Sequence, residues 1–172
     1  MSLVLDASAA LAWIFERADP HEAALADRLL DDITRQSVWV PSLWHLEVAN
    51  ALLVAERRGV VREAQVIDYL QRLHRLPLQS DDAPVSQRQE AIMALGREYR
   101  LSAYDACYLE LALRTGSMLA TFDGKLIAAM ERAGGEIYST VAVQTPSPQP
   151  SPARGEGARE SVACATEASR GV

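Results

Sequence analysis

Short apolar runs, each followed directly by a helical pattern, constrain the fold of this chain more than any other feature of its sequence. The first run, residues 3–5, ends at Asp6, and helix-forming residues follow at once. A strand that passes straight into a helix opens a βα unit, and successive βα units build a parallel sheet covered by helices. The five expected strands are residues 3–5, 37–40, 76–79, 118–121 and 136–139.

Helical patterns fill the segments between these strands. Pro20 suits the first turn of a helix, Gly59 and Gly116 suit helix ends, and Ser42 is placed to cap a helix start. The expected helices are residues 9–15, 20–33, 43–58, 62–75, 84–99, 102–115 and 124–132. Together these elements predict an α/β fold of three layers, α/β/α, in which a central parallel five-stranded sheet has the order 3-2-1-4-5.

The composition changes abruptly after residue 143. The 172-residue chain is long enough for one domain with a substantial core, and we place that domain at residues 1–143. Residues 144–172 are rich in Pro, Ser and Gly without hydrophobic periodicity, which predicts a disordered tail. Two interpretations of the tail are open, a linker or docking segment and a dispensable extension.

The charge balance excludes one class of nucleic-acid-binding protein. With 17 Lys and Arg against 23 Asp and Glu, the net charge is −6, which is wrong for a protein that coats nucleic acid through a basic surface. An enzyme whose acidic site is neutralised by metal ions stays open. No apolar run approaches the roughly 20 residues of a membrane span. The N-terminus lacks a basic signal-peptide region, and the two cysteines have no disulfide or metal spacing, so we expect a cytoplasmic protein.

Two acids follow strands that the predicted order makes neighbours. Asp6 comes directly after the first strand and Asp123 directly after the fourth. The winding of the sheet reverses between these strands, and ligands bind in the crevice at such a reversal. Asp6 or Ser8 also suits the N-cap of the following helix, and that role is compatible with a functional one.

Two further acids, Glu47 and Asp105, fall on otherwise apolar faces of predicted helices. Neither face supplies a Lys, Arg or His within one turn, and an unpaired carboxylate among apolar side chains is costly. A structural alternative exists for Asp105, because Ser102 lies three residues before it and the pair resembles a capping arrangement. This segment alone leaves both interpretations of Asp105 open.

Four acids that converge on a partly buried site cannot all stay ionised unaided, because like charges raise one another's pKa values. A divalent cation removes that conflict, and a set of oxygen ligands suits Mg²⁺ or Mn²⁺ rather than zinc. Such a site suits hydrolysis of phosphodiester bonds, in which metal ions activate water and stabilise the charge on phosphate oxygens.

Four sequence pieces carry a resemblance to a known family. In chain order they read LVLDASAAL, PSLWHLEVANAL, LSAYDACYLELA and LATFDGKL, and they contain all four acids. With this order and spacing, residues 1–143 resemble the PIN-domain family and, more narrowly, its VapC-type toxin ribonucleases. The ordered set is more specific than any single piece, since an Asp after a strand is common.

The resemblance implies a Mg²⁺- or Mn²⁺-dependent endoribonuclease, the toxin of a type II toxin–antitoxin system, which hydrolyses RNA phosphodiester bonds. It also implies a homodimer that a small antitoxin protein silences. Carried over residue by residue, the catalytic and metal-binding acids are Asp6, Glu47, Asp105 and Asp123. The positions that support metal or phosphate through hydrogen bonds are Ser8, Asn50 and Thr121.

Other functions stay open beside this one. The chain is alternatively a catalytically degenerate PIN-like module that only binds a partner, or an RNA-processing nuclease outside a toxin–antitoxin pair. A phosphatase or phosphotransfer domain with Asp6 as its nucleophile usually has a second acid two residues later, where this chain has Ser8.

The sequence identifies the surfaces that would contact RNA or an antitoxin less clearly than it identifies the acids. Arginines cluster at two helix junctions, within residues 57–62 and within residues 72–75. Each cluster either guides RNA phosphates toward the metals or only complements a helix end. Trp13 and Trp44 are either core residues or anchors for an antitoxin segment, and we favour the core.

Overall fold

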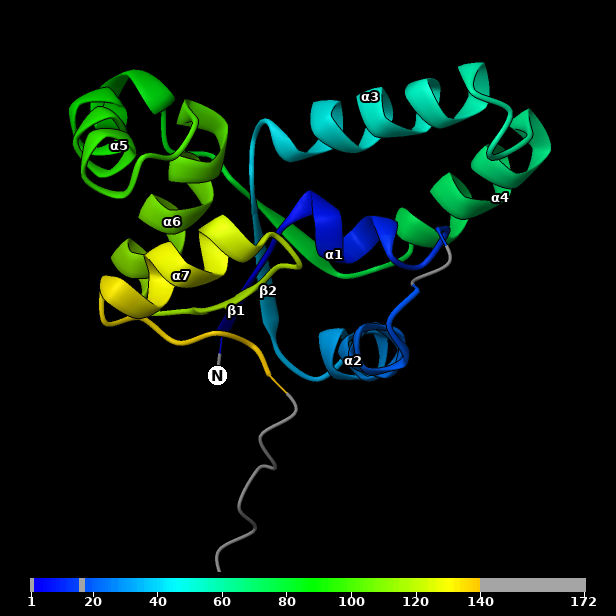
Figure 1. Cartoon of the computed structure of the whole chain (residues 1–172), viewed down its shortest axis with the longest axis horizontal. Coiled ribbons are helices and arrows are strands. Elements are labelled where there is room, and N and C mark those ends of the chain that lie inside the picture. The colour runs from blue at the N-terminus through cyan, green and yellow to red at the C-terminus, as the bar shows by residue number, and fades with distance from the viewer. Residues whose placement is uncertain (1, 16–17, 140–172) are drawn as a thin grey trace, which may run out of the picture. The chain divides into compact units, whose positions relative to one another are not determined.

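Four parallel strands form the sheet of the computed structural model, which describes residues 2–15 and 18–139 (Figure 1). The strands are β1 (Ser2–Leu5), β2 (Ser37–Pro41), β3 (Leu78–Asp81) and β4 (Met118–Ala120). Their order is β3-β2-β1-β4, so β1 lies between β2 and β4, with Leu3 opposite both Val38 and Met118. The predicted parallel sheet and the order of its first four strands are confirmed.

The fifth predicted strand, residues 136–139, and the full order 3-2-1-4-5 are wrong. This segment makes one isolated parallel bridge, between Ile137 and Leu119 of β4. Two backbone hydrogen bonds of 2.9 Å flank the bridge, and both involve Leu119. Pairing stops because β4 ends at Ala120. The next residue, Thr121, uses its hydroxyl to accept a hydrogen bond from the backbone N–H two residues later, and the chain turns there into a helix.

Seven helices accompany the sheet in the described residues, as the sequence predicts. They are α1 (Ala7–Leu11), α2 (Pro20–Ile33), α3 (Trp44–Arg57), α4 (Glu63–Leu73), α5 (Val85–Tyr99), α6 (Ala103–Thr115) and α7 (Gly124–Arg132). Most predicted helix ends lie within two residues of the observed ones, but the end of the first helix and the cap of α3 are wrong. The first helix ends at Leu11 rather than at residue 15, because the chain continues in turns. The N-cap of α3 is Leu43 rather than Ser42, and it makes no side-chain capping bond.

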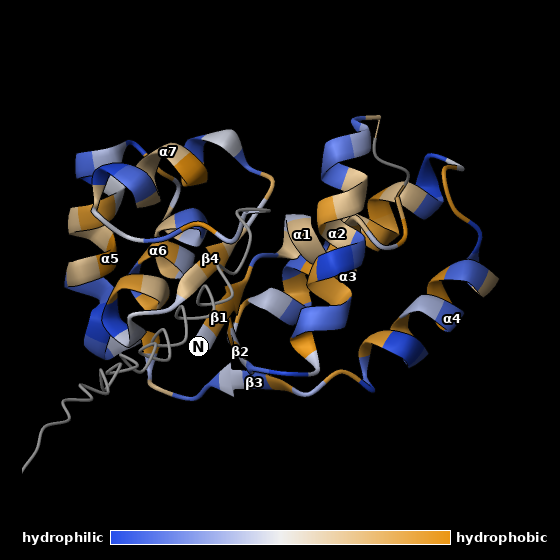
Figure 2. Cartoon of the chain, turned by 90° about the horizontal axis from the view of Figure 1, so that it is seen from below, coloured by the Kyte–Doolittle hydropathy of each residue, from blue (hydrophilic) through white to orange (hydrophobic). Residues whose placement is uncertain are grey.

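The helices lie on both sides of the strands. Figures 1 and 2 show α5, α6 and α7 grouped on one side and α1, α2, α3 and α4 on the other. The apolar side chains of β1 are fully buried, and α6 packs against β1, β2, β4, α5 and α7. Because it is enclosed, α6 is buried on all sides from Ala106 to Ala112. No helix in the described part of the chain has the length and apolar content of a membrane span.

The predicted tail, residues 144–172, lies outside the described residues. The boundary at residue 143 and the disorder of that tail therefore stay predictions.

A cluster of two buried acids and two arginines joins the end of β3 to α5 and α6. Asp81 and Glu110 are buried acids, and each forms ion pairs with both Arg88 and Arg114 at N···O distances between 2.5 and 2.9 Å. The sequence does not single out Glu110, because one of its two cations comes from another helix. The Arg88 side chain is only 14% exposed, so solvent and salt screen these contacts little.

Replacing Arg88 by Ala should lower the free energy of unfolding by about 3 kcal/mol, since two buried acids are left with one cation. The matched control is Arg72→Ala, which breaks the exposed ion pair between Arg72 and Asp68 and should cost less than about 1 kcal/mol. Urea denaturation followed by circular dichroism measures both. If both variants lost the same free energy of unfolding, burial would not determine how much these ion pairs contribute to stability.

Candidate functional site

Asp6 lies buried at the carboxyl end of β1, where it is joined to the end of β4. Its N–H donates to the Ala120 carbonyl at 2.9 Å. Its Oδ2 accepts hydrogen bonds from the Thr121 hydroxyl, at 2.7 Å, and from the Ser8 hydroxyl. The Ser8 hydroxyl also accepts from the Phe122 N–H at 3.0 Å. Asp6 occupies the N-cap position of α1, but its side chain does not cap that helix.

Asp123 lies next to this hydroxyl network and begins α7. Its N–H donates to the Thr121 hydroxyl oxygen at 3.0 Å, so one side chain links Asp123 to Asp6. The Asp123 Oδ1 caps α7 by accepting from the N–H groups of Lys125 and Leu126, at 2.7 and 3.0 Å. The side chain is exposed. The structure thus brings the acids that follow β1 and β4 to the same edge of the sheet.

Glu47 lies half-buried in the first turn of α3. The buried Tyr108 hydroxyl of α6 donates a hydrogen bond to its Oε2. The sequence does not predict this contact, because Tyr108 falls on the otherwise apolar helix face that carries Asp105. A polar atom one turn after Asp105, on the same face of the helix, is the signal that was available.

Asp105 is partly buried near the start of α6. The Ser102 hydroxyl accepts from the Asp105 N–H at 3.1 Å and donates to the Asp105 Oδ2 at 2.7 Å. The capping interpretation of this pair is therefore confirmed. Because only one carboxylate oxygen takes part, capping leaves the other available to a ligand.

Asn50, the seventh predicted site residue, is exposed one turn after Glu47 on α3. The hydrogen bonds that connect Asp6, Ser8, Thr121 and Asp123 do not include it. Asn50 is linked to the other predicted residues by its position on the same helix face as Glu47.

Burial raises the pKa of two of the acids, and nearby acids add to the rise for one of them. Burial raises the pKa of Asp6, and the hydrogen bonds from Ser8 and Thr121 offset this only in part. Burial also raises the pKa of Glu47; the Tyr108 hydrogen bond lowers it, while the negative charges of Asp6 and Asp105 raise it further. None of the ion pairs within residues 2–15 and 18–139 involves these acids.

The donor chemistry of this site fits a hard divalent cation. Every side chain in the set offers oxygen, and two of the carboxylates have raised pKa values that a nearby cation would lower. In the described residues no three Asp, Glu, His or Cys side chains come close enough to share one ion. Mg²⁺ keeps several waters and usually takes only one or two carboxylates from a protein, so it does not require such a group.

Asp6→Asn should make the metal-free protein more stable at about pH 7.5, because it removes a buried charge. The folded-state pKa of Asp6 is raised, so the wild-type carboxyl contributes stability below its ordinary pKa and loses it as the pH rises through the folded value. The gain in the free energy of unfolding that Asp6→Asn brings should therefore shrink as the pH falls from about 7.5 to about 4.5.

Urea denaturation in chelator at the two pH values measures this gain, and a gain independent of pH would contradict the assignment. The control is Asp123→Ala, which removes an exposed helix cap and should lower stability by about 1 kcal/mol at the higher pH.

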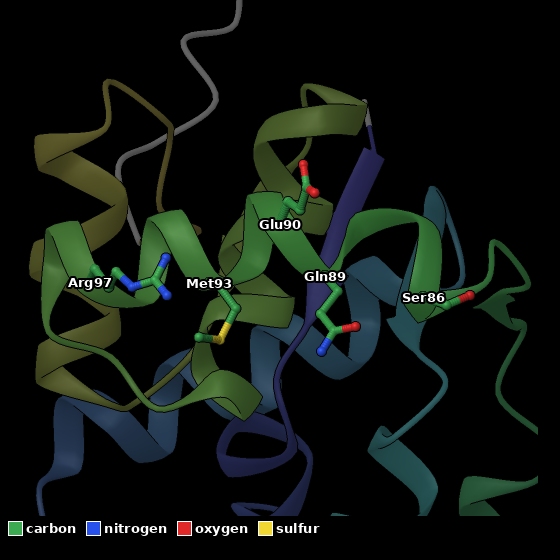
Figure 3. Close-up of a pocket in the computed structure, with 5 residues that line it drawn as sticks. All are labelled: Ser86, Gln89, Glu90, Met93 and Arg97. Carbon is green, nitrogen blue, oxygen red and sulfur yellow. The ribbon is translucent and has the colours of Figure 1, made fainter.

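Two hollows elsewhere on the molecule contain none of the predicted site residues. Figure 3 shows one on α5, lined by Ser86, Gln89, Glu90, Met93 and Arg97. All of these side chains come from a single helix, and no two buried polar groups converge there.

The second hollow is apolar, and one of the two tryptophans considered as core residues or antitoxin anchors, Trp13, lines it. It is lined by Trp13, Leu30, Tyr69, Arg72, Leu73 and Leu76. Trp13 is only partly buried, and its indole N–H donates to the Ala26 carbonyl at 2.9 Å. Trp44 is fully buried, which confirms the core interpretation for that residue.

Known proteins resemble this chain in sequence and in fold. The family model for the PIN domain matches residues 3–132. Ribonuclease VapC3 of Pyrobaculum aerophilum is 30% identical over 128 residues, which cover 73% of this chain and 92% of that protein. The crystal structure of PAE2754 from Pyrobaculum aerophilum has a TM-score of 0.59 at 24% identity, covering 80% of this chain and 88% of its own. FitAcB from Neisseria gonorrhoeae has a TM-score of 0.52 at 15% identity, with 74% and 92% covered; these two structures bear on the fold alone.

Proposed function

This chain belongs to the PIN domain family, and on that premise we propose that it is a metal-dependent endoribonuclease, the toxin component of a type II toxin–antitoxin system. The observation that carries the proposal is the set of acids Asp6, Glu47 and Asp105. The negative charges of Asp6 and Asp105 raise the pKa of Glu47, and none of the three acids forms an ion pair within the described residues. RNA is the proposed substrate because a relative is named as a ribonuclease.

The residues of the site divide into two roles in this proposal. The metal ligands, for Mg²⁺ or Mn²⁺, are drawn from Asp6, Glu47, Asp105 and Asp123. When bound, the metal activates a water molecule and stabilises negative charge on phosphate oxygens. The hydroxyls of Ser8 and Thr121 fix the orientation of the Asp6 carboxylate, and the exposed Asn50 amide is free to donate to a phosphate oxygen.

Cleavage of a mixed RNA pool by the full chain with Mn²⁺ tests the activity. Asp6→Asn should reduce the cleavage rate at least about 100-fold, because a lost ligand weakens both metal binding and charge stabilisation. A chelator should abolish cleavage by the wild type.

A folded protein that neither cleaves RNA nor binds Mn²⁺ would contradict the proposal and favour a degenerate binding module. Mn²⁺ binding without cleavage of the pool would keep the metal site and indicate a narrow RNA substrate.

We further propose that the arginines of residues 57–62 guide RNA phosphates. They are exposed and form none of the ion pairs of the described residues, whereas Arg72 of the other cluster is neutralised by Asp68. Replacing Arg57 and Arg58 by Ala should weaken RNA binding. It should also flatten the plot of log affinity against log salt by about 0.7 per lost phosphate contact.

Arg72→Ala is the control for this experiment and should leave the salt slope unchanged. Fluorescence anisotropy with labelled single-stranded RNA measures both, without cleavage, in chelator. An unchanged slope in the Arg57 and Arg58 variant would remove this cluster from the RNA path.

The proposed partners are a small antitoxin protein, which silences the enzyme, and a second copy of the chain in a homodimer; the proposed location is the cytoplasm. Trp13 is the candidate antitoxin anchor, since it is partly exposed and Trp44 is not. Co-expression with the neighbouring small reading frame, followed by co-purification, tests the pairing. A complex that survives Trp13→Ala removes that residue from the interface.

A further inference from the structure

Tyr108 lies where three elements that carry predicted metal-site acids meet. Its hydroxyl donates to the Glu47 carboxylate of α3, and Tyr108 itself follows Asp105 by one turn on α6. Burial, the bond to Glu47 and the charge of Asp6 all raise the pKa of Tyr108. α6 also packs against β1, the strand that Asp6 follows.

The ring of Tyr108 is fixed by the core, whereas the Glu47 side chain is only half-buried. Tyr108 is one of the largest fully buried side chains, with 1% of its surface exposed, so packing determines where its hydroxyl points. Glu47 is a half-buried side chain with several rotatable bonds, and the Tyr108 hydroxyl is its hydrogen-bonding side-chain partner in the described structure. The rigid group therefore sets the position of the flexible one.

The hydrogen bond from Tyr108 affects metal binding because it restrains the Glu47 carboxylate. Glu47 experiences repulsion from Asp6 and Asp105, and an unrestrained carboxylate would turn toward solvent. A hydrogen bond from a neutral donor holds the carboxylate without neutralising it, unlike the arginines that pair with Glu110. Carboxylates that bind metals are commonly held in this way by neighbouring groups.

We propose that Tyr108 is a positioning residue for divalent-metal binding, whose hydroxyl holds the Glu47 carboxylate in place before the ion arrives. Tyr108 acts through Glu47 and does not touch the metal. The inference rests on the proposed function, because it requires that these acids bind Mg²⁺ or Mn²⁺.

The affinity of the full chain for Mn²⁺ tests this inference. It is measured by electron paramagnetic resonance in the absence of RNA. Tyr108→Phe keeps the ring and removes the hydroxyl, and it should weaken Mn²⁺ binding about 10-fold or more. The matched control is Tyr138→Phe. Tyr138 is also buried, and its hydroxyl donates to a carboxylate, Asp32 Oδ2, at 2.7 Å, but neither residue belongs to the predicted site. This variant should bind Mn²⁺ as the wild type does.

The Glu47→Gln background separates positioning from a loss of stability. If Tyr108 acts through Glu47, Tyr108→Phe should cause no further loss of Mn²⁺ affinity once Glu47 is Gln. Thermal melts of all variants identify a temperature at which each is folded, and binding is measured there. An equal loss of affinity in both backgrounds would overturn the positioning role.

Failure of the inference and failure of the proposed function give different results. If Glu47→Gln weakens Mn²⁺ binding while Tyr108→Phe does not, the inference is overturned and the metal site stands. If the wild type binds Mn²⁺ no better than Asp6→Asn does, the proposed function fails and the inference fails with it.

Discussion

The site depends on a carboxylate that the fold buries without a counter-charge. Asp6 ends the central strand of the sheet, and its neighbours there, Ser8 and Thr121, are donors that carry no charge. Hydrogen bonds of this kind satisfy the carboxylate oxygen but compensate only part of the lost hydration. The hydrophobic core formed by β1 and the helices around it must therefore hold an unfavourable charge in place. Such a charge favours any divalent cation that reaches it.

One helix shows how differently the chain treats two groups of acids. On α6, Glu110 contacts Arg88 and Arg114, and its negative charge is balanced inside the protein. Near the start of the same helix, the Asp105 carboxylate accepts a hydrogen bond from the uncharged Ser102 hydroxyl and forms none of the ion pairs of the described residues. The first arrangement stabilises the packing of α5, α6 and β3, and the second leaves negative charge available. Burial alone does not tell these two arrangements apart; the presence of a cationic partner does.

The sequence predicts those parts of the molecule that depend on local pattern. The run before Asp6 and the run before Asp123 are adjacent parallel strands because βα units with short connections leave few other arrangements. It does not predict the bond between Tyr108 and Glu47, since that bond depends on how α3 and α6 pack across 61 positions of sequence. The fifth strand fails for a related reason. Residues 136–139 have a strand-like sequence, but β4 offers them only one residue to pair with.

The single bridge between Leu119 and Ile137 also affects how this edge of the sheet can pair with a strand of another molecule. The exposed edge of a sheet is a template on which a strand from another molecule can add, and such addition leads to aggregation. At β4 the outward N–H and C=O of Leu119 are both occupied by residues 136 and 138 of the same chain, and the strand is three residues long. An incoming strand therefore finds no unpaired peptide group at Leu119. A segment too short to count as a strand thus takes the place beside Leu119 that an incoming strand would use.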